Sequence, residues 1–135
     1  MSLYSDRITP RRDGIQYGRA VAAGKIIYVG ALACLNTTGY LVPGASDSTL
    51  IADGVAVQFA DNSLGANGAL TIIVDKRVHR FNNSLNADLI TIANIGDNCY
   101  VVDDETVALT NGGSTRPLAG EITDVDDDGV WVKFN

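Results

Sequence analysis

Short apolar runs separated by turn residues recur along most of this chain, and they predict strands rather than helices. The segments 25–35, 54–60 and 69–81 are rich in β-branched residues and are bounded by Gly, Asn or Asp. Only the segment 82–96 has the capping residues of a short helix. We therefore expect an all-β fold of about eight short antiparallel strands, as a small β-barrel, β-tulip or sandwich with at most one short helix.

The clearest single element is a hairpin over residues 118–134, LAGEITDVDDDGVWVKF. Asp128-Gly129 between two apolar runs is a strong turn signal, because Gly adopts backbone angles that other residues avoid. Three apolar side chains after the turn share one face: Val130, Val132 and Phe134. Val125 is out of phase with the strand before the turn, which predicts either the start of the turn or a β-bulge there.

The first 24 residues differ from the rest because they show no sustained period. Pro10 favours an extended conformation in the residue before it, and Asp13-Gly14 marks a turn. Apolar residues such as Ile8 are more frequent than a free tail needs, which suggests a segment that orders on a partner. We expect an extended N-terminal arm over 1–24 and one β-rich body domain over 25–135. The segment 69–81 becomes basic at its end, which predicts a strand that leaves the core for an edge or a contact surface.

The charge of the chain is unevenly distributed. The net charge is −6 over 135 residues, yet four arginines and only two aspartates lie in the first twenty. The acidic remainder should repel nucleic acid and anionic membranes, whereas the arm suits an acidic partner. Lys76, Arg77 and Arg80 beside Phe81 are the one candidate nucleic-acid surface, and the acidity of the body argues against it.

Targeting signals and cysteines change this picture little. Residues 1–24 hold no continuous apolar core, and no run reaches the roughly 18 apolar residues of a membrane span, so neither a signal peptide nor a span is expected. Cys34 and Cys99 each lie in an apolar run and are expected to be buried thiols; a disulfide between them is the alternative.

Two features have the residue types of a chemical site. DVDDDG at 124–129 matches the opening of a calcium loop, but Asn135 stands where such a loop needs a bidentate Glu. A solvated hairpin turn is favoured, and calcium stays open. His79 lies among Lys76, Arg77 and Arg80, which supply no nucleophile, and we expect it on the exposed face of a strand. We expect no enzyme, no metal site and no cofactor.

Five segments in order resemble proteins of the tailed-phage capsid decoration, or cement, family. They are TPRRDG at 9–14, IIYVGALACLNTTGYLVP at 26–43, ANGALTIIVDKRVHRFNNS at 66–84, DNCYVVDDETVALTNGG at 97–113 and AGEITDVDDDGVWVKF at 119–134. The resemblance covers nearly the whole chain. It implies a structural protein made in the bacterial cytoplasm and carried on the virion exterior, where it binds the outside of the bacteriophage head and bridges capsomers.

The resemblance also implies partners. These are the major capsid protein and further copies of the chain, with a trimer favoured over a dimer, and no nucleic acid or membrane. Position alone assigns capsid contact to the arm: Arg7, Thr9, Pro10, Arg11, Arg12, Asp13 and Tyr17. The alternative is a carbohydrate-binding or host-adhesion β-sandwich module, for which Trp131 and Tyr100 are the only aromatic hint.

Overall fold

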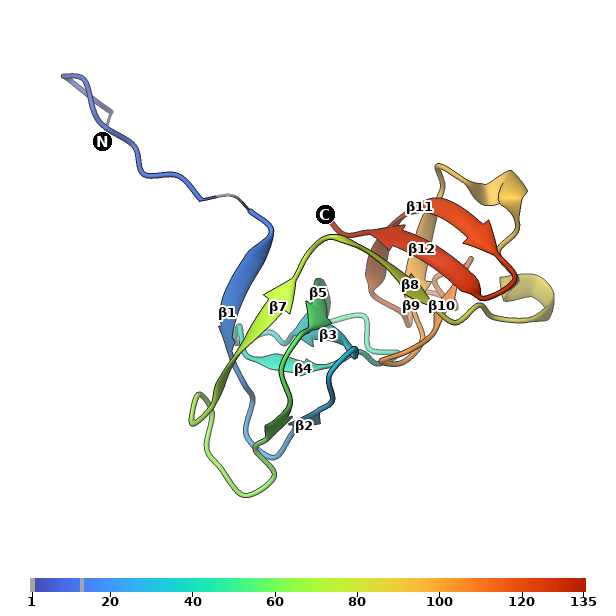
Figure 1. The fold of residues 1–135 in the computed structure, drawn as a ribbon, viewed down its shortest axis with the longest axis horizontal. Coiled ribbons are helices and arrows are strands. Elements are labelled where there is room, and N and C mark those ends of the chain that lie inside the picture. The colour runs from blue at the N-terminus through green and yellow to red at the C-terminus, as the bar shows by residue number, and fades with distance from the viewer. Residues whose placement is uncertain (1, 13) are drawn as a thin grey trace.

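Two five-stranded antiparallel sheets form the body in the computed structural model, which describes residues 2–12 and 14–135 (Figure 1). The first sheet has the order β1-β7-β5-β3-β4, with strands Gln16–Ala20, Thr71–Asp75, Ile51–Ala56, Leu32–Leu35 and Leu41–Pro43. The second has the order β10-β9-β11-β12-β8, with strands Val107–Ala108, Asn98–Val101, Leu118–Asp126, Gly129–Lys133 and Val78–Phe81. The predicted all-β fold is confirmed, and the open sheets fit a sandwich rather than a closed barrel.

Three segments that were expected to be single strands are each divided between sheets. The segment 54–60 contributes to β5 in the first sheet and to β6 (Ala60–Asp61), which belongs to a separate two-stranded sheet with β2 (Ile26–Ile27). The segment 69–81 forms β7 in the first sheet and β8 in the second, with Lys76 and Arg77 at the crossing (Figure 1). The segment 25–35 forms β2, which pairs with β6, and then β3, with a turn at Gly30 (φ of 88°) between the two strands. The crossing from β7 to β8 connects the two five-stranded sheets, whereas the step from β2 to β3 connects the two-stranded sheet to the first five-stranded sheet.

The hairpin of β11 and β12 is confirmed, and its bulge explains the phase of Val125. The register shifts between Ile122 and Asp124, after which Val125 pairs with Val130. Val125 therefore continues the strand and does not begin the turn. Gly129 is required for a second reason beyond the turn, because a Cβ atom at this position would collide with the carbonyl oxygen of Phe81 on β8.

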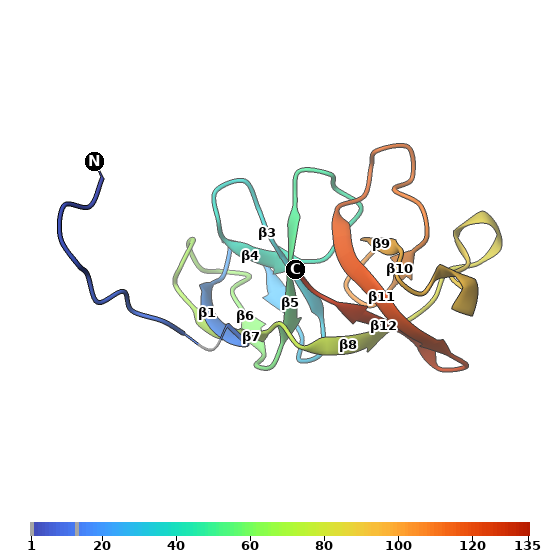
Figure 2. The same ribbon diagram turned by 90° about the horizontal axis from the view of Figure 1, so that it is seen from above.

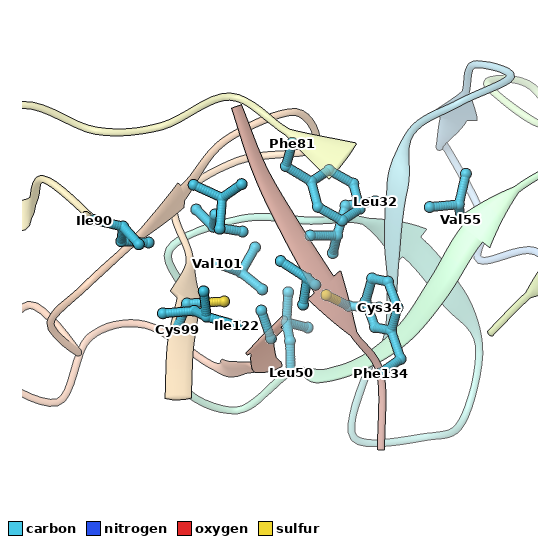
Figure 3. Packing of buried hydrophobic residues seen from close by; sticks show 14 of the residues in the cluster. Leu32, Cys34, Leu50, Val55, Phe81, Ile90, Cys99, Val101, Ile122 and Phe134 are labelled. Atoms are coloured by element: carbon cyan, nitrogen blue, oxygen red, sulfur yellow. The ribbon is translucent and has the colours of Figure 1, made fainter. Parts of the chain in front are cut away.

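The larger core cluster draws side chains from both sheets (Figure 3). Leu32 and Cys34 from β3 pack in it with Cys99, Val101 and Ile122 from the second sheet. Cys34 and Cys99 lie apart in this cluster and are free thiols. Burial raises the pKa of each to about 12, so neither is a reactive thiolate at neutral pH. The expectation of buried thiols is confirmed.

The helix expected in the segment 82–96 is absent there, and two 3-10 helices replace it: η1 (Asn86–Asp88) and η2 (Ile92–Asn94). Asn83 explains the difference, because its side-chain amide donates to the carbonyl oxygen of Ile90 and its Oδ1 accepts from the Ile90 N–H. Such side-chain bonds compete with an α-helical pattern. Across residues 2–12 and 14–135, no helix is long and apolar enough to cross a membrane.

The N-terminal arm is shorter than the predicted 1–24. Residues 2–12 are exposed and run away from the body in both views (Figures 1 and 2). From Gln16 the chain is β1, an edge strand that pairs with β7, and Val21 behind it is fully buried. The boundary between arm and body therefore lies before Gln16.

Candidate functional site

The arm residues that were assigned to partner contact are separated into two environments. An exposed segment without strand or helix contains five of them: Arg7, Thr9, Pro10, Arg11 and Arg12. Asp13 lies outside the described residues. Tyr17 lies on β1 and is half-buried against the body. The structure therefore keeps the arginines available to a partner. It places Tyr17 at the root of the arm, which is the region where β1 joins the arm to the body.

Tyr17 supports two cations at this root. The guanidinium carbon of Arg19 lies 4.8 Å from the centre of the Tyr17 ring, and the Nζ of Lys76 lies 5.4 Å from it. Cations at these distances are attracted by the face of an aromatic ring. Tyr17 thus joins β1 to the crossing between the two sheets, which is a structural contribution that its position in the arm did not suggest.

A buried carboxylate, Asp53 on β5, holds the same two cations. Only 2% of Asp53 is exposed. Arg19 donates from Nε to Oδ2 at 2.7 Å and from Nη2 to Oδ1 at 3.0 Å, while Lys76 Nζ lies 3.4 Å from Oδ1. The hydrogen bond to Asp53 raises the pKa of Arg19. This bidentate pair fixes β1 against the centre of the first sheet.

A second buried carboxylate, Asp75 at the end of β7, lies beside the first. It accepts from Gln16 Nε2 at 3.1 Å, from the Arg77 backbone N–H at 2.8 Å and from Arg77 Nη1 at 3.3 Å. His79 Nε2 lies 3.1 Å from its Oδ1. His79 was expected on the exposed face of a strand, and it is instead partly buried beside this carboxylate, with 29% of its side chain exposed. In the described part of the chain no hydroxyl or thiol is hydrogen-bonded to His79, so the pair fits a structural role.

Asp75 gives the root of the arm a predicted dependence on pH. Burial acts to raise its pKa, but the hydrogen bonds from Arg77, Gln16 and His79 and the charge of Arg77 outweigh it and hold the pKa below its ordinary value. Stability from this carboxylate is therefore present above about pH 4, the ordinary Asp value, and is lost as the pH falls through its lowered pKa. Thermal melts of the protein and of Asp75→Asn should differ at pH 7 and converge near pH 2.

The acidic hairpin tip is held together by its own hydrogen bonds. Asp126 Oδ1 accepts from the backbone N–H groups of Asp128 and Gly129, and Oδ2 accepts from Trp131 Nε1 at 2.8 Å. The Trp131 bond is the largest cause of a lowered pKa at Asp126. Within the described ranges no three acidic, His or Cys side chains are placed to hold a metal ion. The geometry favours the turn over the calcium loop.

The two aromatic residues considered for sugar binding are not brought together. Tyr100 pairs with Leu118 and Trp131 pairs with Asp124, at opposite ends of β11. Six residues along a strand span about 20 Å. The structure shows a different exposed aromatic pair: Tyr28 and Phe59, with ring centres 5.6 Å apart and more than half of each residue exposed.

The positive charges of the candidate nucleic-acid surface are largely balanced by neighbouring carboxylates. Lys76 contacts Asp53, Arg77 contacts Asp75 and Arg80 Nη1 lies 3.7 Å from Asp128. Phe81 is buried in the core and offers no face for base stacking.

Comparisons with known protein families, with curated proteins and with solved structures found no match for this chain.

Proposed function

We propose that this chain is a structural decoration, or cement, protein of a tailed-phage head, which binds the outer surface of the shell and bridges capsomers. The exposed arm is the observation that carries the proposal. Tyr4 is 93% exposed and Ile8 is 96% exposed, beside three arginines that form no ion pair with the described residues. Apolar and cationic groups held out in this way suit a partner surface that is apolar and acidic.

The attachment of the arm supports the same proposal. Asp53 and Asp75 fix β1 to the body through Arg19 and Gln16, so force on the arm is transmitted to the first sheet. A ligand that binds only the assembled shell stabilises that shell by mass action. Many weak arm contacts, repeated by the symmetry of the shell and by a homo-oligomer of this chain, would add to a high avidity.

Removal of the arm tests the proposal. A chain without residues 1–12 should lose nearly all occupancy on shells assembled from the major capsid protein of the same genome, as measured by co-sedimentation and electron microscopy. The triple variant Arg7→Gln/Arg11→Gln/Arg12→Gln should lose most of it, because each charge contact contributes to docking. Asp124→Asn/Asp127→Asn at the exposed hairpin tip is the matched control and should bind normally.

Normal occupancy by the truncated chain would show that the arm does not dock on the shell. Equal losses from the arginine variant and from the hairpin variant would also count against the proposal, because they would show that the loss is not specific to the arginines of the arm.

A carbohydrate-binding module remains the second candidate, and one observation favours it. Tyr28, whose ring centre lies 5.6 Å from that of Phe59, lines a shallow pocket together with Asp104 and Glu105. Aromatic faces and carboxylate acceptors are the groups that bind sugars. Glycan-array binding that is lost in Tyr28→Ala, by a protein that leaves shells undecorated, would favour this function over the first.

A further inference from the structure

Two segments that are about sixty residues apart in sequence meet at the root of the arm. The backbone N–H of Lys76 donates to the carbonyl oxygen of Ile15 at 2.7 Å, and Gln16 pairs with Asp75. One shallow pocket is lined by residues of both segments: Arg12, Gly14, Ile15, Gln16 and Arg77. The crossing between β7 and β8 therefore lies near the start of β1, where the arm begins (Figure 1).

Arg77 is the cation that this crossing presents to solvent. Its backbone N–H and its Nη1 both bind Asp75, which fixes the direction of the side chain. Even so, 62% of the side chain is exposed. A guanidinium has five N–H donors, and the contact with Asp75 occupies one of them. Lys76 and Arg19 differ, because both are mostly buried against Asp53.

We propose that Arg77 and Arg12 form one carboxylate-binding notch that completes the docking surface of the arm. This inference rests on the proposed function and adds the crossing to the residues that contact the shell. The notch selects a partner surface with at least one carboxylate within reach of both guanidinium groups. Arginine forks bind such a carboxylate with two parallel hydrogen bonds, which fixes direction as well as position.

The chemistry of the arm identifies the partner as protein rather than nucleic acid. Leu3, Tyr4 and Ile8 on the same arm are exposed and need apolar cover, which a phosphate backbone does not offer. An acidic and partly apolar protein surface can cover the apolar side chains at the tip of the arm and bind the arginines at its root.

Charge reversal at the notch tests this inference on the full-length protein. Arg77→Glu should weaken binding to shells of the major capsid protein about tenfold, because it removes one cation and adds a like charge to the contact. Lys25→Glu makes the same charge change at an exposed position of the body that lies outside the notch, and it should bind as the unchanged protein does. Arg77→Lys should fall between them, since a lysine lacks the planar fork.

Arg77→Glu could weaken binding by disturbing the fold around Asp75. Arg12→Glu tests the same notch without that risk, because Arg12 lies on the exposed arm. The double variant Arg12→Glu/Arg77→Glu should lose less than the product of the two single losses if both arginines bind one carboxylate. Equal binding by Arg77→Glu and Lys25→Glu overturns the notch while leaving the proposed function intact.

Absence of binding by the unchanged protein overturns the proposed function itself. Retention of duplex DNA at 0.15 M salt by the unchanged protein, lost in Arg77→Glu, would assign the surface to nucleic acid and overturn the choice of partner.

Discussion

A chain that lacks residues 1–19 should be unfolded or should melt far below the full-length protein, whereas a chain that lacks only residues 1–12 should melt with it. The larger deletion removes most of β1, including Gln16 and Arg19. Asp53 and Asp75 are 2% and 3% exposed, and each loses a hydrogen-bonding partner. Together with the lost strand pairing, the destabilisation should be on the order of 5 kcal/mol, which is comparable with the whole stability of many small domains.

Urea unfolding followed by circular dichroism measures this difference. The midpoint for the chain without residues 1–12 should match that of the full-length protein, because residues 2–12 are exposed throughout. A cooperative transition at the same midpoint after deletion of residues 1–19 would show that β1 contributes little to the body. The distinction matters for any binding experiment, because only the shorter deletion separates loss of docking from loss of fold.

The strand β1 shows where inference from the sequence ends. Its five residues, QYGRA, carry a glycine and an arginine and have no apolar alternation. What makes them a strand is long-range: the edge of β7, and two buried carboxylates that accept hydrogen bonds from Gln16 and Arg19. By contrast, the hairpin of β11 and β12 was predictable, because its turn residues and its period of two are local signals.

The crossing at Lys76 and Arg77 could be predicted in part from the sequence. A run that begins apolar and ends basic predicted a strand that leaves the core, and the chain does leave the first sheet there. The sequence did not show that the run continues as β8 in a second sheet, because strand partners depend on tertiary contacts. Nor did it show that the crossing lies beside the arm.

The buried carboxylates were the residues of the candidate site that sequence reasoning missed. An aspartate between apolar runs usually marks a turn, and Asp53 precedes a glycine. Asp53 instead lies inside β5, where Arg19 and Lys76 balance its charge. The available signal was an acid within an apolar segment, together with basic residues elsewhere that lacked an assigned partner. That signal indicates a buried ion pair without identifying the two segments that form it.

Replacement of Asp53 should be the most damaging single substitution at the root of the arm. Asp53→Ala leaves Arg19 and Lys76 facing a nearly buried site without their acceptor, and it removes two hydrogen bonds of 2.7 and 3.0 Å to the guanidinium. Loss of one partner of a buried pair typically destabilises a protein by roughly 3 to 5 kcal/mol. Arg19 and Lys76 are partly exposed and regain some hydration, so we expect about 3 kcal/mol.

A double-mutant cycle with Arg19→Ala isolates the interaction itself. The two single variants and the double variant, measured by urea unfolding, should give a coupling free energy of about 1 to 3 kcal/mol, because the side chains are in direct contact. Asp127→Ala at the exposed hairpin tip is the control, and it should leave the midpoint unchanged. A coupling near zero would mean that Arg19 and Asp53 stabilise the body independently. The attachment of the arm would then have to rest on the pairing of β1 with β7 and on Asp75.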